Sequence, residues 1–311
     1  MFRIPANKVT RLDHVLILAD IEGSSGCWSY AGSAFKTRQW VSACVEMSRD
    51  VDAVVKSLFD SGVRQITVKD FHRTGYNLLP ERIDPRCRIV SGYRRAPVPG
   101  IGHPSGAEAV MFLGLHAASG TNGFLAHTLT SRIGRLTVNG NPLPEIALFA
   151  ASLAPFGIRP IFFTGCPVAC RQAVETIAGI DTFAIEKSAG PEGFDVRQWR
   201  QALAAAAAGS LQNRHVAPFQ PEGPFDATVT MRDGEEIASH LARRWGLESR
   251  GADILIRTDT IHALYRALIR ICYLTPLAER ILPLSLALFN LQGRLGLAWL
   301  RRQLKNDGRT G

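Results

Sequence analysis

Two carboxylates stand directly after an apolar run near the start of this 311-residue chain. Asp20 and Glu22 follow residues 15–19, five apolar residues that indicate a buried parallel strand. In an extended chain, residues i and i+2 point to the same side, so the two acids can converge on one point. A cation between them would relieve their repulsion, which makes this turn a candidate metal site. A loop with a solvated acid pair is the alternative interpretation.

Three further positions repeat this pattern of an apolar strand or turn followed by a side chain that can bind a metal. His72 follows a predicted strand at 65–69, His116 follows a predicted strand at 109–114, and Glu145 follows a predicted hairpin turn. Open α/β sheets place their ligands at the carboxyl ends of the strands, so these side chains are expected to meet. Each has a structural alternative, because loop histidines are often only hydrogen-bonded and a glutamate is favourable at a helix N-terminus.

The combined set supplies three carboxylates and two imidazoles: Asp20, Glu22, His72, His116 and Glu145. These ligands suit zinc, or manganese and cobalt. Five ligands are too many for one four-coordinate site with an open position, but they suit two metals if one carboxylate bridges. Three carboxylates and one hydroxide would balance two divalent cations. Such a pair would hold a nucleophilic hydroxide at neutral pH and polarise a carbonyl, which predicts a metal-dependent hydrolase.

Apolar runs and amphipathic segments alternate along the chain and would position these residues. A helix is predicted over 37–61, where apolar residues recur at helical spacing, with Gly62 as its C-terminal stop. The alternation predicts an α/β fold with a three-layer core and a mostly parallel central sheet. A proline-containing linker at 218–224 suggests a catalytic domain over residues 1–217. The remainder, 218–311, is predicted to be a smaller α+β C-terminal part with a basic, apolar helical tail.

Composition indicates an ordinary globular protein, with 46% hydrophobic and 20% charged residues. The six cysteines include no C-x-x-C pair and no disulfide framework, which predicts reduced thiols and a cytoplasmic protein. Residues 1–14 contain no apolar core of a secretory signal. No uninterrupted apolar segment reaches the roughly 18 residues that suggest a membrane-spanning helix.

The net charge of +9 is concentrated in the last quarter of the chain. No recognition motif for nucleic acid accompanies it, so nucleic acid is not expected as a partner. The tail at 261–304 is apolar with scattered arginines, and Pro276 and Pro283 are expected to break it into short helices. These helices are predicted to pack on the body or on a neighbouring subunit. A basic amphipathic anchor at a membrane surface is the alternative.

Taken together, these motifs resemble the M55 family of metallopeptidases, of the D-aminopeptidase type found with dipeptide-transport operons. The likeness runs in order from about residue 15 to 165, roughly half of the chain. It is carried by D-I-E-G-S-S-G at 20–26, D-F-H at 70–72, F-L-G-L-H-A at 112–117, A-H-T at 126–128 and V-N-G…E at 138–145. The resemblance implies an aminopeptidase with two Zn²⁺ per subunit that hydrolyses short peptides, with a preference for N-terminal D-residues. It also implies a ring-built homo-oligomer.

The same resemblance implies a division of the metal ligands between two sites. Asp20 matches the position that bridges both metals. Glu22 and His72 match the residues that complete one site, while His116 and Glu145 match those that complete the other.

His127 matches the catalytic residue outside the metal shell, a general acid/base or a stabiliser of the tetrahedral intermediate. The chain departs from the family at Cys166, where an acidic residue is usual, and over 186–193, so its substrate pocket is expected to differ. Two other functions stay open: a basic protein that binds a membrane surface or a partner through an inactive hydrolase core, and a two-metal hydrolase of non-peptide amides.

Overall fold

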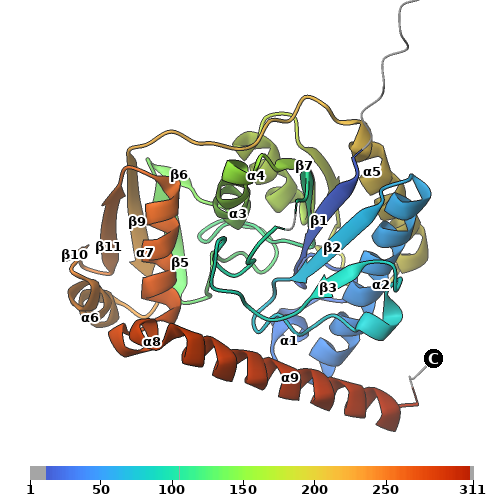
Figure 1. Cartoon of the computed structure of the whole chain (residues 1–311). Coiled ribbons are helices and arrows are strands. Elements are labelled where there is room, and N and C mark those ends of the chain that lie inside the picture. Colours follow the sequence, from blue (N-terminus) through green and yellow to red (C-terminus); the bar gives the residue numbers. More distant parts are fainter. Residues whose placement is uncertain (1–11, 105, 309–311) are drawn as a thin grey trace, which may run out of the picture.

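The computed structural model describes residues 12–104 and 106–308, and the predictions made for residues 1–11 lie outside them. Within the described residues, six strands form a parallel sheet in the order β3–β2–β1–β4–β7–β8 (Figure 1). Their bounds are β1 His14–Ala19, β2 Gln65–Asp70, β3 Arg88–Val90, β4 Ala109–Leu113, β7 Arg159–Gly165 and β8 Asp181–Ala184.

The predicted strand at residues 15–19 is the centre of this sheet. β1 is buried along its whole length and pairs with β2 on one side and β4 on the other. Its last residue, Ala19, is in register with both Asp70 and Leu113. The three strands therefore end level, and the segments that follow them leave the sheet at one edge.

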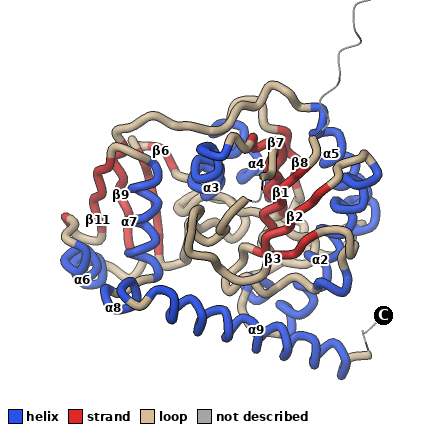
Figure 2. The backbone as a smooth tube through the Cα atoms, in the orientation of Figure 1, coloured by secondary structure: helices blue, strands red, loops and turns tan. Residues whose placement is uncertain are grey.

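Helices cover both faces of the sheet, which confirms the predicted three-layer α/β fold (Figure 2). Alternate residues of β1 enter two different cores, because side chains along a strand alternate between faces. One core contains α2 (Arg38–Asp60) and α5 (Val196–Gly209), and the other contains α3 (Glu145–Leu153) and α4 (Pro167–Thr176). Short helical turns lie at α1 Tyr30–Ser33 and at the 3₁₀ segments Pro80–Arg82, Ala154–Phe156 and Ser210–Gln212.

A second, antiparallel sheet has the order β10–β11–β9–β5–β6 in the described part of the chain. Its strands are β5 Ile133–Val138, β6 Asn141–Pro142, β9 Phe225–Met231, β10 Glu248–Arg250 and β11 Asp253–Thr258, and it packs against α6 (Glu235–Trp245) and α7 (Ile261–Tyr273). The hairpin β5–β6 thus joins a sheet whose other strands follow residue 218. The division of the chain at 217/218 stays a prediction.

The tail forms α8 (Pro276–Arg280) and α9 (Leu282–Asn306). The expectation of only short helices is wrong for α9, because Pro283 lies in its first turn, where its missing N–H has no helical acceptor to lose. α9 runs along the body (Figure 1) and buries Leu297, Leu300 and Leu304, as the packing prediction requires. The leucines on its other side are exposed: Leu284, Leu288, Leu291 and Leu295. Among the described residues, no helix is long and apolar enough to cross a membrane.

Candidate metal centre

The side chain of Asp20 lies between two histidines that come from different strands. Its Oδ1 is 3.0 Å from His72 Nδ1, and its Oδ2 is 3.5 Å from His116 Nε2. The backbone N–H of Ile21 donates to Oδ1 at 2.8 Å and fixes the carboxylate plane. A carboxylate whose two oxygens face different imidazoles has the geometry that a bridging ligand requires. The level ends of β1, β2 and β4 produce this arrangement.

One group of possible ligand atoms comprises Asp20, Glu22 and His72, all within 4.8 Å of one another. Glu22 Oε2 lies 3.1 Å from His72 Nδ1, but that nitrogen already faces Asp20. Within the described residues, this buried oxygen therefore has no hydrogen-bond partner of its own. His72 Nε2–H donates to the carbonyl of Ser33 at the end of α1, 2.9 Å away. The ring is held with its other nitrogen toward both acids, as in metal-binding histidines.

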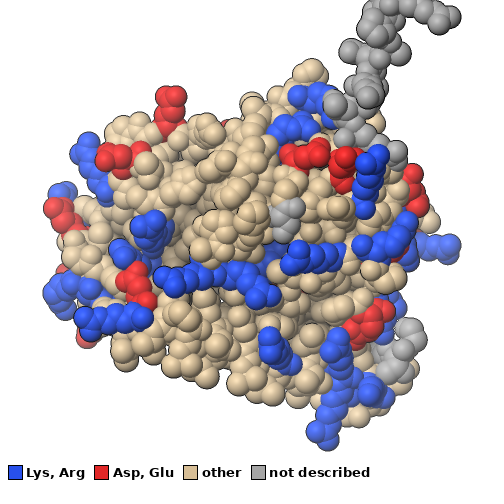
Figure 3. Space-filling view, in the orientation of Figure 1, with Lys and Arg blue, Asp and Glu red and all other residues tan. Residues whose placement is uncertain are grey.

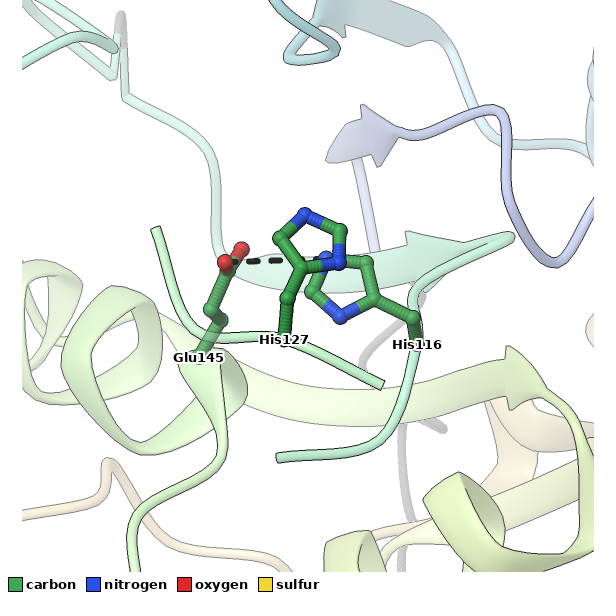
Figure 4. Close-up of side chains that lie close together, drawn as sticks. All are labelled: His116, His127 and Glu145. Atoms are coloured by element: carbon green, nitrogen blue, oxygen red, sulfur yellow. Dashed lines mark ion pairs between the residues drawn. The ribbon is translucent and has the colours of Figure 1, made fainter. Parts of the chain in front are cut away.

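The second group comprises His116, His127 and Glu145 (Figure 4), whose ligand atoms also lie within 4.8 Å of one another. His116 Nε2 is 3.5 Å from Glu145 Oε1, and the two imidazole rings stack with centroids 3.7 Å apart. His116 Nδ1–H donates to the carbonyl of Ala117, and His127 Nδ1–H donates to that of Leu125. In both neutral rings, Nε2 is therefore the nitrogen with a free lone pair.

The structure thus brings together all six residues singled out in the sequence, and it places His127 inside the second group. Glu145, at the first position of α3, also accepts the backbone N–H of Leu129 at 2.6 Å. The roles of these residues as ligands or proton carriers stay predictions.

Burial strongly perturbs the ionisation of this cluster. Burial, reinforced by the charge of Glu22, raises the pKa of Asp20 to about 6. Burial and the neighbouring His127 lower the pKa of His116 to about 4. Burial would also lower the pKa of His72, but Glu22 and Asp20 outweigh it and raise that pKa well above its usual value. Without a metal, protonated His72 is the cation that neutralises Asp20 and Glu22.

Metal binding is therefore expected to weaken as the pH falls through about 6, the pKa of Asp20. Below that pH the metal must displace a proton from Asp20, in addition to the proton that His72 holds both below and above pH 6. The measurement is the difference in Tm between zinc-loaded and EDTA-treated protein, at a pH about one unit below and one unit above 6. The difference should be larger at the higher pH, and an equal difference would contradict the assignment.

Asp70, the first residue of the D-F-H motif, fixes the loop that carries His72. It accepts backbone N–H groups from Asn77 and Leu78, the latter at 2.8 Å. The Asn77 side chain donates both to Asp70, at 2.9 Å, and to the carbonyl of His72, at 2.7 Å. Asp70 thus acts through hydrogen bonds to the loop and is absent from both groups of possible metal ligands described above.

Two charged residues that the sequence analysis missed hold the turn after Glu22. Lys187 Nζ donates to the carbonyls of Ser24 and Cys27, and it lies 4.3 Å above the ring of Trp28. Burial lowers the pKa of Lys187 to about 8. No local pattern marks this lysine, because its partners lie about 160 residues earlier in the chain.

The second is Asp50 of α2, which accepts from the backbone N–H and the hydroxyl of Ser25, both at 2.8 Å. Arg200 of α5 pairs with the same carboxylate at 2.8 Å. A signal for Asp50 was present in the sequence. It lies three residues after Met47 and four before Val54, within the apolar stripe of its helix. A charged residue in such a stripe is expected to be buried and to have a polar partner.

Gly114 allows the acidic turn to approach the end of β4. It has φ of +79°, and a Cβ at this position would overlap the carbonyl oxygen of Asp20. Gly114→Ala is expected to reduce the free energy of unfolding by about 2 kcal/mol or more, from backbone strain and displacement of the turn. Thermal or urea unfolding measures it. Gly140→Ala is the matched control, because Gly140 has φ of +84° but open space around its Cβ position. Equal losses in the two variants would contradict the close-approach argument.

Comparison with known proteins gives consistent matches. The Peptidase_M55 family model, described as D-aminopeptidase, matches residues 14–269, a segment that contains all six site residues but neither α8 nor α9. The chain is similar to a D-aminopeptidase of Bacillus subtilis (strain 168), with 23% identity over 245 residues, 78% of this chain and 88% of that protein. It is also similar in fold to a solved structure described as the Zn-dependent D-aminopeptidase DppA from Bacillus subtilis, a self-compartmentalizing protease. That match has a TM-score of 0.74 and 21% identity, and covers 83% of this chain and 96% of the other.

Proposed function

Because this chain belongs to the M55 family of D-aminopeptidases, we propose that it is a zinc-dependent aminopeptidase that hydrolyses short peptides. The observation that carries the proposal is the position of Asp20, with one carboxylate oxygen toward His72 and the other toward His116. A buried acid in this setting would cost stability unless a cation neutralised it. The intact set of ligand-type side chains supports an active enzyme over a binding protein with an inactive hydrolase core.

We assign two zinc sites to these residues. Asp20 would bridge, Glu22 and His72 would complete the first site, and His116 and Glu145 would complete the second. Two features fit this donor set. Glu22 Oε2 is unpartnered, and each histidine donates one N–H to a main-chain carbonyl, which leaves its other ring nitrogen available to a metal. When bound there, zinc would make a water nucleophilic near neutral pH and would polarise the scissile carbonyl.

His127 is the residue to which we assign proton transfer. Its Nδ1–H is held by the Leu125 carbonyl at 2.8 Å, which leaves Nε2 as the basic atom. The side chain is half-buried, whereas the five proposed ligands are buried, so it can reach a substrate from the open side of the cluster. From there it can accept a proton during attack and donate one to the leaving amine.

Three finer properties belong to the proposal. N-terminal D-residues are the proposed substrate preference, in line with the family description. A homo-oligomer is proposed because the similar Bacillus subtilis enzyme is described as self-compartmentalizing. Cytoplasmic localisation is proposed because all six cysteines are free thiols. Cys166, where the chain departs from the family, is buried. It lies beside Gly123, which belongs to the same loop as His127.

The test combines metal analysis with a substrate panel on the purified full chain. We expect two zinc ions per subunit, and hydrolysis of D-aminoacyl amides faster than of their L-counterparts. EDTA should remove the activity and added zinc should restore it. Metal-free protein from zinc-replete cells, with no hydrolysis of any aminoacyl amide, would refute the proposal. Hydrolysis of non-peptide amides alone would assign the site to the other hydrolase class.

A further inference from the structure

A hollow lies away from the metal centre, between the β2–β3 edge of the parallel sheet and the loop at 91–104. Its volume is about 320 Å³, within the range of small-molecule sites. Its polar and charged lining, among the described residues, is cationic or neutral and contains no carboxylate: Thr67, Lys69, Arg88, Arg94 and His103. Lys and Arg side chains also form a band across this face, over the position of β3 in Figure 1 (Figure 3).

The register of the sheet explains how the cations meet. Thr67 pairs with Arg88 and Lys69 pairs with Val90, so these side chains share one face of the sheet. The loop folds over that face through a closed turn. Arg94 N–H donates to the carbonyl of Gly100 at 3.2 Å, and Gly100 N–H donates back at 2.9 Å.

Lys69 is the most unusual member of the lining because it is only 1% exposed. Its Nζ donates to the carbonyl of Asp70 and lies 5.5 Å from the ring centroid of Phe71 and 4.9 Å from that of Tyr93. In the described part of the chain, no carboxylate lies within 4.0 Å of its ammonium group. Burial, together with the positive charge of Arg94, lowers its pKa to about 8, although the charge of Asp70 acts in the opposite direction. A buried cation with no carboxylate in ion-pair contact is costly, and an anion in the hollow would reduce that cost.

We propose that this hollow binds a small anion that carries a phosphate group. Lys69, Arg88 and Arg94 offer three positive charges, and the two arginines have no acidic partner within ion-pair distance among the described residues. A phosphate monoester carries about −1.5 to −2 near neutral pH, whereas a single carboxylate carries only −1. Guanidinium forks match phosphate oxygens and the lysine adds a point charge. The volume leaves room for an organic group beyond the phosphate.

The site is separate from the proposed catalytic residues, although β2 contributes to both. None of the residues that line the hollow belongs to the six residues of the metal centre. Occupancy is therefore measurable apart from peptide hydrolysis, and the inference does not depend on the proposed function.

Calorimetric titration of the full chain with inorganic phosphate, and separately with phenyl phosphate, tests the proposal at constant ionic strength. We expect both to bind, with phenyl phosphate tighter if the site receives a phosphate ester and inorganic phosphate tighter if it receives the free ion. Arg94→Gln and Lys69→Met should each weaken binding about tenfold or more, because each removes a charge-assisted contact. Arg95→Gln is the matched control: Arg95 is the exposed neighbour of Arg94 and is absent from the lining.

Two results would overturn the inference. One is the absence of phosphate binding by the parent chain. The other is equal binding by the parent, Arg94→Gln and Lys69→Met, which would place the phosphate elsewhere, including at the metal centre. If Lys69→Met does not fold, the phosphate affinities of Arg94→Gln and Arg95→Gln still decide the question, because both arginines are exposed.

Discussion

Asp20→Ala is expected to remove zinc and peptidase activity together. Asp20 is the residue that faces both His72 and His116, so its loss affects both proposed metal sites at once. Loss of an outer partner of a ligand weakens metal binding about 10- to 100-fold, and loss of a shared ligand should exceed that. Zinc content after gel filtration and hydrolysis of an aminoacyl amide are the two measurements.

Asp13→Ala is the control for this variant. Asp13 also lies at an end of β1, but it is exposed and its pair with Arg64, at 3.5 Å, is a surface contact. Zinc content and activity should match those of the parent. The bridging role of Asp20 would be disproved by an Asp20→Ala protein that is folded and retains two zinc ions per subunit.

His127→Ala is expected to separate catalysis from metal binding. If His127 carries protons and is no ligand, kcat should fall by about 10²- to 10⁴-fold while both zinc ions are retained. KM should change little, because the metals and not the imidazole would hold the substrate carbonyl. Steady-state kinetics and metal analysis of the same preparation provide the comparison, and exposed His262 offers the control variant His262→Ala.

Loss of zinc from the His127→Ala protein would also have a structural explanation, in the second group of possible ligands. The His127 ring stacks on that of His116, and its ligand atom lies within 4.8 Å of those of His116 and Glu145. A fall from two zinc ions to one in His127→Ala would therefore make it a ligand. The assignment of proton transfer to His127 would then be wrong.

Local patterns were enough to predict most of the parallel sheet. Residues 15–19 have only apolar side chains because both faces of β1 are covered, and a strand of that kind is recognisable without its partners. The helix predicted at 37–61 is α2, and each of its two bounds lies within one residue of the predicted one. Thr37 caps its start, and Gly62 follows its end. The length of α9 differs from the prediction of short helices, because Pro283 stands in the first turn of the helix, where a proline causes no break.

The proposed ligands could be located because each follows a strand or turn within three residues. The contacts that hold them in place were beyond local patterns. His72 donates to the main-chain carbonyl of Ser33, and a main-chain contact has no sequence signature. Lys187 donates to the carbonyl of Ser24 in the acidic turn, 163 residues earlier in the chain. The pairing of β5 with β9 was likewise hidden, because a hairpin's outer partner depends on residues far along the sequence.

The tail helix α9 sets a practical limit on truncation. The family match ends at residue 269, yet Asn290 of α9 accepts the N–H of Tyr93 at 2.8 Å and donates to its carbonyl at 3.1 Å. Trp299 stacks on Trp40 of α2 with centroids 6.2 Å apart. A protein cut at the homology boundary would lose these contacts and open the indole of Trp40 to solvent. The helix outside the family match therefore shields part of the family segment itself.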